Sequence, residues 1–447
     1  MNVAGSPTVV LSPWVGMYQP KRNKSAAIRK AWATKREWSK ARPLGVGCSK
    51  NSELGDAMIE GSCGPRFNAV REAFEANFRE RGDIGAAVAV TLGGQSVVDL
   101  WGGYADEAQT IQWRKDTIVN VWSVGKAVVA VCLLRLVDKG LVDLDAPVAR
   151  YWPEFAQGGK EGLPVRMLLS HQAGLPAIAK PLEPGINLTS WSTMANALAE
   201  QEPWWEPGAR FGYHTNTFGF LVGEVVRRVD GRGIGRFLQE EVAKPLGIDL
   251  FFGFGPEEDH RVAEWVAYKA EPGQASDRPW LELDPATLSG IDLARVLAYR
   301  NPPGGSGTPP GANSRVWRAS EYPSTSGHSN ARAISRLYGA LAAGGEIDGY
   351  RVLSPATIAR ANTIQSDGED AILGRPNRFG LGFQLTIPGV RPLGPGARSF
   401  GHYGNGGVLG FADPDAQLGF GFVCNRAGRS WRDPRNIALI DAVYASL

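Results

Sequence analysis

The order of strand-like and helix-like segments restricts the fold of this chain more than any other feature. Residues 84–92 and 96–101 are two apolar runs separated by Gly93-Gly94, a pattern that predicts a β-hairpin. Further strand-like runs come only near the other end of the chain, at 379–386, 406–411 and 418–424, the last two joined by a turn at Asp413-Pro414-Asp415. Because strands from both ends can pair in one sheet, we expect a single antiparallel sheet built from the two ends.

Helical periodicity dominates the rest of the chain. Apolar residues recur at helical spacing in segments at 65–80, 123–139, 216–230, 234–246, 329–343 and 434–446. We therefore expect an α+β fold, with terminal helices on one face of the sheet and a mostly helical region inserted. The expected division is a sheet domain from 58–125 and 330–447, and a helical inserted domain at 126–329. The Pro/Gly-rich stretch 301–312 is expected to be a surface loop, either a lid or a plain connection.

Composition and charge exclude several classes of protein. Apolar residues make up 43% of the chain and charged residues 21%, as in ordinary globular proteins. The net charge of +3 is too small to indicate nucleic acid as the main partner. No run reaches about 18 consecutive apolar residues, so no membrane span is expected. The oligomeric state cannot be inferred from these features.

The cysteines point to a reducing compartment. The chain has four of them, scattered without the spacing of a disulfide framework or a zinc site: Cys48, Cys63, Cys132 and Cys424. Unpaired thiols persist in reducing surroundings, and no signal peptide is visible at the N-terminus. We therefore expect a cytoplasmic protein.

Positive charge gathers in the first part of the chain. Residues 1–57 hold 10 Lys or Arg against 3 Asp or Glu, a net of +7, and nine of these basic residues lie within 21–42. We expect residues 1–57 to be a basic, poorly ordered extension that the chemistry does not need. The alternative is an arm that binds nucleic acid or a membrane surface.

Common hydrolase and nucleotide-binding motifs are absent from the sequence. There is no Gly-x-Ser-x-Gly elbow, no phosphate-binding loop and no His-Glu-x-x-His zinc helix. The five histidines show no metal-ligand spacing.

A Ser-x-x-Lys tetrapeptide is present, however, at the start of an apolar helical segment. Ser123 and Lys126 are three residues apart, so they lie on the same face of that helix. A desolvated lysine has a lowered pKa and can accept a proton, and serine becomes a nucleophile when a neighbouring base takes its proton. The alternative is a helix-capping serine followed by a surface lysine. The apolar flanks favour the chemical interpretation.

Two further segments supply groups that such a nucleophile needs. Tyr213 follows a Pro-Gly turn, and a tyrosine beside a lysine ammonium has its phenolate favoured, which suits proton transfer. The glycine-rich stretch 400–407, FGHYGNGG, exposes backbone N–H groups at close range, as an oxyanion site requires. In isolation, Tyr213 fits ordinary packing and residues 400–407 fit a tight turn at a sheet edge.

Together these segments resemble the serine β-lactamase-related family, and most closely its family VIII carboxylesterases, which share the class C β-lactamase fold. The likeness covers most of residues 59–445. The stretches that carry it, in order, are DLWGGYAD (99–106), WSVGK (122–126), LLSHQAGLP (168–176), WEPGARFGYHTNTFGFLVGEVVRR (205–228), SNARAISRLYGALAAGGEIDG (329–349), RFGLGF (378–383) and FGHYGNGGVLGFADPDAQLGFGF (400–422).

The resemblance implies roles for three side chains. Ser123 would be the acylated nucleophile and Lys126 its partner in proton removal, while Tyr213 would act as general base and then acid. The residue two after the tyrosine is Thr215, which departs from the Tyr-x-Asn pattern of the lactamases and resembles the esterase branch. No metal or organic cofactor is implied.

The resemblance also implies functions for the glycine-rich stretch 400–407. His402, with Tyr403 and Gly404, stands where the lactamases carry Lys-Thr-Gly, so the cation that would bind a β-lactam carboxylate is missing. The backbone N–H groups of Ser123 and Asn405 would form the oxyanion hole.

The expected function is hydrolysis of small carboxylic esters, with short-chain acyl groups as the default. The same scaffold could instead cleave a β-lactam, an amide or a D-peptide, transfer its acyl group to another alcohol, or serve as a catalytically silent binding protein. The tryptophans of the inserted region could line an apolar pocket: Trp204, Trp205, Trp280 and Trp317.

Overall fold

The computed structural model describes residues 58–270, 274, 278–303, 311–430 and 432–447. The expected basic extension 1–57 lies outside the described residues, and so does most of the expected loop 301–312.

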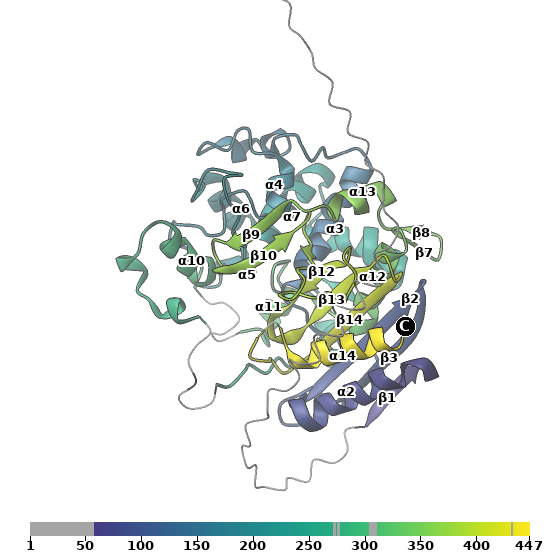
Figure 1. Cartoon of the computed structure of the whole chain (residues 1–447). Helices are drawn as coiled ribbons and strands as arrows, with labels where there is room; N and C mark the ends of the chain where they lie inside the picture. Colours follow the sequence, from purple (N-terminus) through teal and green to yellow (C-terminus); the bar gives the residue numbers. More distant parts are fainter. Residues whose placement is uncertain (1–57, 271–273, 275–277, 304–310, 431) are drawn as a thin grey trace, which may run out of the picture. The chain divides into compact units, whose positions relative to one another are not determined.

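The described residues form a nine-stranded antiparallel sheet built from both ends of the sequence (Figure 1). Its order is β1-β3-β2-β14-β13-β12-β11-β10-β9, so the N-terminal hairpin pairs with the last strand of the chain. The strands are β1 (Ile59–Cys63), β2 (Gly85–Leu92), β3 (Gln95–Gly103), β9 (Ser366–Asp370), β10 (Arg375–Phe379), β11 (Gln384–Leu385), β12 (Phe400–Tyr403), β13 (Leu409–Asp413) and β14 (Leu418–Cys424). This arrangement confirms the expected sheet.

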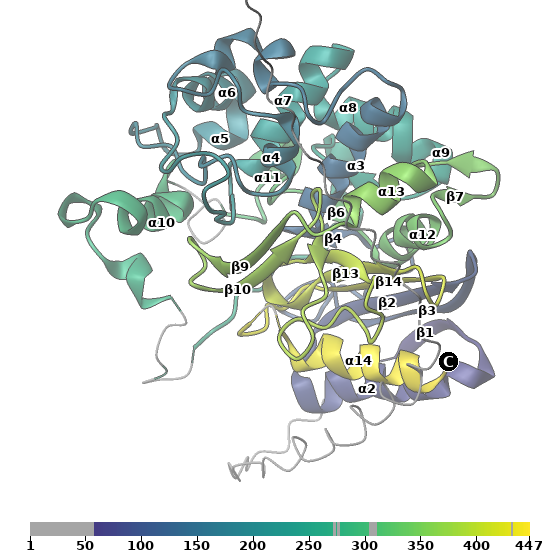
Figure 2. The ribbon, with the colours of Figure 1, turned by 45° about the horizontal axis from the view of Figure 1, so that its top comes forward.

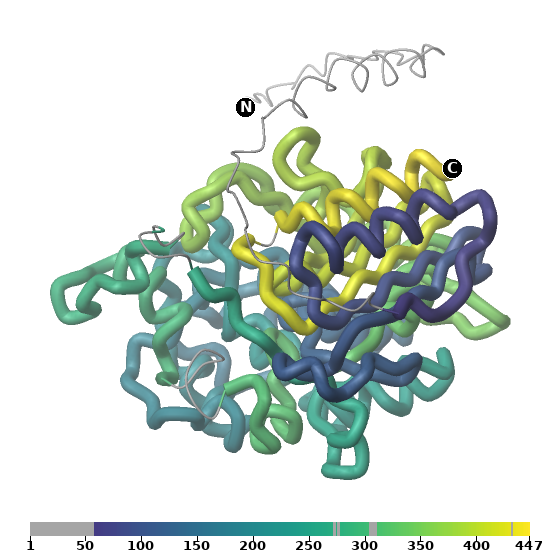
Figure 3. The backbone as a smooth tube through the Cα atoms, turned by 90° about the horizontal axis from the view of Figure 1, so that it is seen from below, coloured from purple at the N-terminus to yellow at the C-terminus, as the bar shows by residue number. Residues whose placement is uncertain are grey.

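Helices cover both faces of the sheet, which explains why its central strands are apolar throughout. Helices α2 (Asn68–Arg81) and α14 (Pro434–Ala445), from opposite ends of the described chain, pack side by side on one face (Figures 2 and 3). Helix α12 (Ala331–Ala342) crosses β2, β13 and β14 on the other face. A Cβ at Gly419 would lie 2.2 Å from the Gly339 nitrogen, so glycine in β14 lets α12 approach closely.

The helical region is organised around α3 (Val124–Asp138), whose residues are nearly all buried. Helix α3 packs against α7 (Phe218–Asp230) of the inserted region and against β12 of the sheet. The other helices here are α4 (Val165–Leu169), α5 (Ile186–Thr189), α6 (Trp191–Glu200), α8 (Ile234–Leu238), α9 (Lys244–Leu246), α10 (Gly290–Arg300), α11 (Arg315–Ala319) and α13 (Pro355–Ala361). The domain boundaries at 125/126 and 329/330 stay a prediction.

Two small sheets complete the described structure. A three-stranded sheet with the order β4-β6-β5 joins β4 (Val119–Asn120), β6 (His328–Ser329) and β5 (Leu250–Phe251), and β7 (Glu346–Ile347) pairs with β8 (Tyr350–Arg351). Strand β4 ends three residues before Ser123, so the first of these sheets fixes the approach of the chain to α3.

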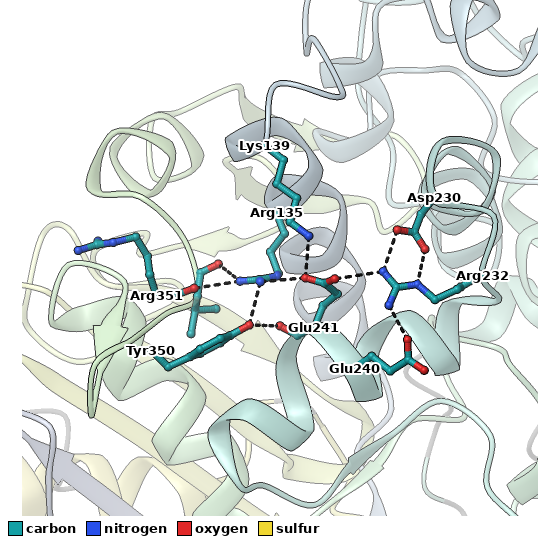
Figure 4. A network of polar contacts seen from close by, with 9 residues as sticks. Arg135, Lys139, Asp230, Arg232, Glu240, Glu241, Tyr350 and Arg351 are labelled. Carbon is teal, nitrogen blue, oxygen red and sulfur yellow. Dashed lines mark hydrogen bonds and ion pairs between the residues drawn. The ribbon is translucent and has the colours of Figure 1, made fainter.

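A polar network holds the C-terminal half of α3 (Figure 4). The Glu241 carboxylate accepts hydrogen bonds from Arg135 at 3.0 Å, Lys139 at 2.8 Å and Arg232 at 3.1 Å. The Tyr350 hydroxyl donates to the Glu241 carbonyl and accepts from Arg135. Glu241 lies in a π-helical turn, Gln239–Ala243, between α8 and α9. The network thus joins α3 to the α8–α9 region and to strand β8.

Two predicted strands differ from the structure. The run 379–386 is broken, because β10 ends at Phe379 and β11 begins at Gln384, with Gly382 at a positive φ of 82° between them. The run 406–411 becomes β13 only from Leu409, because Asn405–Gly407 forms a tight 3-10 turn. Glycines at left-handed φ interrupt both strands. None of the described helices has both the length and the apolar run that a bilayer crossing requires.

Candidate active site

Ser123 stands at a sharp turn between β4 and α3. The preceding Trp122 has a φ of 52°, in the left-handed region that bulky residues rarely adopt, and its ring packs against Trp265 and Trp317. The Ser123 side chain makes no helix-capping hydrogen bond. Its hydroxyl therefore stays free for other partners at the partly exposed N-terminus of α3.

Lys126 lies one turn into α3, beneath Ser123. Its side chain is 0% exposed, and its Nζ lies 3.1 Å from Ser123 Oγ and 3.0 Å from the Ser324 carbonyl oxygen. Burial lowers the pKa of Lys126 well below its usual range, so the neutral amine is accessible. Because Lys126 is buried and hydrogen-bonded to Ser123, the alternative of a helix-capping serine followed by a surface lysine is wrong.

The segment around Ser324 packs directly against α3 and α7. A Cβ at Gly125 would lie 2.3 Å from the Pro323 carbonyl oxygen, and one at Gly219 would lie 2.7 Å from the Ser324 nitrogen. The Gly219 N–H also donates to Ser324 Oγ at 2.7 Å. Glycine at both positions therefore allows the Ser324 carbonyl to reach Lys126.

Tyr213 lies against both groups, just before α7. The Lys126 Nζ is 4.9 Å from the centre of the Tyr213 ring, which is 7% exposed and stacks on Phe379. Burial raises the pKa of Tyr213, and this effect outweighs the neighbouring Ser123 hydroxyl, which lowers it. The expectation that the lysine favours the phenolate was wrong, because desolvation dominates and Lys126 is itself driven toward neutrality.

His402 comes from β12 and presents a neutral ring. It is 1% exposed, and its Nδ1 donates to the Tyr403 carbonyl at 2.7 Å. Burial and then the nearby Lys126 lower the pKa of His402 well below its usual range. Among the described residues no group bonds to its buried Nε2, and its ring centre lies 6.1 Å from that of Tyr213.

Gly404 and Asn405 follow at the end of β12. A Cβ at Gly404 would lie 2.7 Å from the Val121 carbonyl oxygen, so the end of β12 abuts the turn that carries Ser123. Asn405 is exposed. Within the described chain, the backbone N–H groups of Ser123 and Asn405 donate to no backbone or side-chain acceptor. The structure thus brings all six predicted site residues to one region.

Sequence reasoning missed His171 as a neighbour of Tyr213. His171 has a φ of 61°, and its ring contacts Tyr213 at 5.0 Å and Phe379 at 4.4 Å between ring centres. Its Nδ1 accepts the His214 N–H at 3.1 Å, and burial lowers its pKa well below its usual range. The only signal was its position in LLSHQAGLP, one of the stretches that carry the family resemblance.

The tryptophans divide into core and partly exposed residues. Trp317 is 1% exposed and lies in the main core, and Trp205 is buried against Ala177 and Ile372. Trp204 and Trp280 are partly exposed, and Trp280 packs against Tyr299. In the described residues there is no group of three or more His, Cys, Asp or Glu that could hold a metal ion.

A serine with a buried lysine at a helix N-terminus, a tyrosine beside them and two free N–H groups is an arrangement that can carry out acyl transfer through the serine. The β-lactamase family model matches residues 74–445. The chain belongs to the β-lactamase family.

The individual relatives include proteins named as esterases and a penicillin-binding protein homologue. Esterase/beta-lactamase LipL of Mycobacterium tuberculosis is 36% identical over 377 residues, 82% of this chain and 83% of LipL. The crystal structure of a family VIII carboxylesterase is 39% identical, with a TM-score of 0.79 over 87% of this chain and 100% of that one. A penicillin-binding protein homologue from Caulobacter crescentus is also 39% identical, with a TM-score of 0.78 and the same coverage.

Proposed function

We propose that this protein is a serine hydrolase that cleaves small carboxylic esters through an acyl-enzyme on Ser123. The observation that carries the proposal is the buried Lys126 amine, 3.1 Å from the Ser123 hydroxyl. The esterase name of LipL and the family VIII carboxylesterase structure support an ester as substrate. Short-chain acyl groups remain the default expectation.

In the proposed acylation step, Ser123 Oγ attacks the ester carbonyl while neutral Lys126 takes its proton. The negative charge that develops on the carbonyl oxygen is stabilised by the N–H groups of Ser123 and Asn405. Tyr213, kept neutral by burial, donates its proton to the departing alkoxide. The Lys126 ammonium returns a proton to Tyr213, so the site ends in its starting protonation state.

Deacylation reverses these roles. Water attacks the ester of Ser123, and its proton passes to the Tyr213–Lys126 pair. The serine oxygen leaves with a proton from the same pair, which restores the free hydroxyl. No step requires a metal or an organic cofactor.

The neutral His402 favours an ester over a β-lactam. A β-lactam carries a carboxylate, and an uncharged imidazole offers it no cation at the position of the lactamase lysine. We therefore propose that β-lactam turnover is a weak side activity, while amide hydrolysis and acyl transfer are the alternative functions of the same scaffold.

The test is hydrolysis of p-nitrophenyl acetate and butyrate by the full chain and by Ser123→Ala, with nitrocefin in parallel. We expect ester turnover that falls by several orders of magnitude in Ser123→Ala, because the members of such a unit act together. A fluorophosphonate probe should label the wild type and not the variant. Equal turnover by both proteins would refute the site. A folded wild type that neither turns over nor takes the probe would favour a silent binding protein.

A cytoplasmic location is proposed from the cysteines alone. The cysteines that the structure describes, Cys63, Cys132 and Cys424, are free, and burial raises their pKa values. Fractionation of cells that express the full chain checks this proposal, and recovery outside the cytoplasm would overturn it.

A further inference from the structure

The hairpin of β9 and β10, at the edge of the large sheet, reaches the segment that carries Tyr213. The Ala371 N–H donates to the Phe211 carbonyl at 3.1 Å, so the hairpin runs along residues 211–213. The Tyr213 N–H donates to Asp370 Oδ1 at 2.9 Å, and the Phe379 ring stacks on the phenol with an angle of 9° between the planes. One hairpin thus contacts both the backbone and the ring of Tyr213.

Asp370 is a buried carboxylate whose oxygens are fully engaged. Its Oδ1 also accepts the N–H groups of Ile372 and Leu373, each at 3.0 Å, and its Oδ2 accepts the Asn377 side-chain amide at 2.9 Å. Burial raises the pKa of Asp370, while these donors act in the opposite direction. All four donors require an acceptor at position 370.

Two further hydrogen bonds fix the orientation of the Asn377 side chain. Its side-chain oxygen accepts a hydrogen bond from Arg391 and the Arg378 N–H, the latter at 3.2 Å. Arg391 is 1% exposed, and burial lowers its pKa to about 10, so it stays cationic near neutral pH. The side-chain amide of Asn377 therefore cannot turn its oxygen toward Asp370 without losing its hydrogen bond from Arg391.

We propose that Asp370, held by Asn377 and Arg391, is the positioning residue that sets Tyr213 for proton donation to the leaving alcohol. The inference rests on the proposed ester hydrolysis. Asp370 acts on Tyr213 through the backbone N–H that it accepts and through its charge, which raises the pKa of Tyr213. Its effect must therefore be largest where the leaving group needs a proton from Tyr213.

Other ionisable groups around Tyr213 are not expected to replace this function. Lys126 faces the ring from α3, His171 from the loop after α4, and His402 from β12, and burial disfavours the charged form of all three. Arg391 lowers the pKa of Tyr213 through its charge, whereas the Asp370 charge raises it.

The test compares two butyrate esters that differ only in the leaving group. p-Nitrophenolate leaves without a proton, whereas ethoxide needs one, and kcat/KM reports the steps through acylation. In Asp370→Asn, the new side-chain NH₂ group faces the NH₂ group of Asn377, so two hydrogen-bond donors oppose each other. We expect their repulsion to displace the segment that carries Tyr213. We expect kcat/KM for ethyl butyrate to fall about 10–100-fold, with less than about a 3-fold change for p-nitrophenyl butyrate.

Two further variants separate positioning from folding. The exchange Asp370→Asn/Asn377→Asp gives every donor an acceptor again, so we expect it to restore the wild-type ratio of the two esters. Asp413→Asn is the matched control, because Asp413 is likewise buried and accepts backbone N–H groups, at a turn between β13 and β14. It should leave the ratio unchanged.

Each outcome bears on one proposal. A folded Asp370→Asn that slows both esters equally, or neither, overturns the positioning role. If that variant does not fold, the exchange variant decides: a ratio shifted toward the p-nitrophenyl ester overturns the proposal, and a wild-type ratio supports it. A wild type without Ser123-dependent turnover refutes the proposed function instead.

Discussion

Adding a single methyl group at Gly404 should separate the two halves of the proposed oxyanion hole. A Cβ at this position lies 2.7 Å from the Val121 carbonyl oxygen and 3.0 Å from Val408 Cβ. The Val121 carbonyl accepts the Val124 N–H at 3.2 Å and so belongs to the turn that carries Ser123. Gly404 directly precedes Asn405. The clash therefore falls between the two N–H groups that would bind the oxyanion.

The size of the effect follows from these distances. An ordinary contact needs 3.4 Å or more, so the backbone on one side must move by about 0.7 Å. A misplacement of about 1 Å costs about 100-fold in rate, so Gly404→Ala should lower kcat about 30-fold. That loss corresponds to about 2 kcal/mol of transition-state stabilisation. Losing one oxyanion donor entirely would cost about 100–1,000-fold, which sets the upper limit.

The assay is steady-state hydrolysis of p-nitrophenyl butyrate, beside a thermal melt that shows the variant is folded. Gly162→Ala is the matched control, because its Cβ meets nothing within 4 Å and its φ is not positive. The control should keep wild-type kcat. A folded Gly404→Ala with kcat within about 3-fold of the control would show that this contact does not set the oxyanion geometry.

Two other changes test the frame around the site. Burial raises the pKa of Glu241, but hydrogen bonds from Lys139, Arg135 and Arg232 outweigh it and bring it to about 2, from 4.5. Because the folded-state pKa is depressed, this stabilisation is present above pH 4.5 and is lost as the pH falls toward 2. Solvent reaches part of this carboxylate and screens its ion pairs, so denaturant unfolding should show Glu241→Gln about 1 kcal/mol less stable at pH 7 and close to wild type near pH 2. A chain that starts at Met58 should keep full esterase activity, because every proposed site residue lies beyond it, and a truncate that loses activity or folding would contradict this. A salt-dependent shift on nucleic acid or anionic lipid, lost on truncation, would instead assign residues 1–57 a binding function.

Local pattern was enough to predict the central elements of the fold. The strands β2 and β14 and the helix α3 are long, apolar and buried on all sides, so their sequences report their structure directly. The edge strands β1 and β9 and the neighbouring strand β10 read IEGSC, SDGED and RPNRF, and no such pattern marks them. Their positions depend on pairing with distant strands, which a local pattern cannot encode.

The same distinction holds in the candidate site. Ser123 and Lys126 were predictable because their spacing of three residues places them together on any helix. The Ser324 carbonyl reaches Lys126 across 198 positions, and Asp370 reaches Tyr213 across 157. No spacing rule applies to such contacts. The prediction that Lys126 lowers the pKa of Tyr213 was wrong for a related reason. The number of groups that bury the phenol depends on the whole fold.

Burial also gives the site a property that its residue types conceal. Lysine, histidine and tyrosine appear to offer charge, yet the structure drives Lys126, His171, His402 and Tyr213 all toward their neutral forms. A neutral ester can therefore enter without having to match a fixed charge. In the proposed mechanism, the oxyanion then meets the free N–H groups in surroundings of low dielectric constant, where such hydrogen bonds are strongest. By the same reasoning, a substrate that brings its own carboxylate loses hydration without gaining a cation, so nitrocefin should be turned over far less efficiently than a butyrate ester.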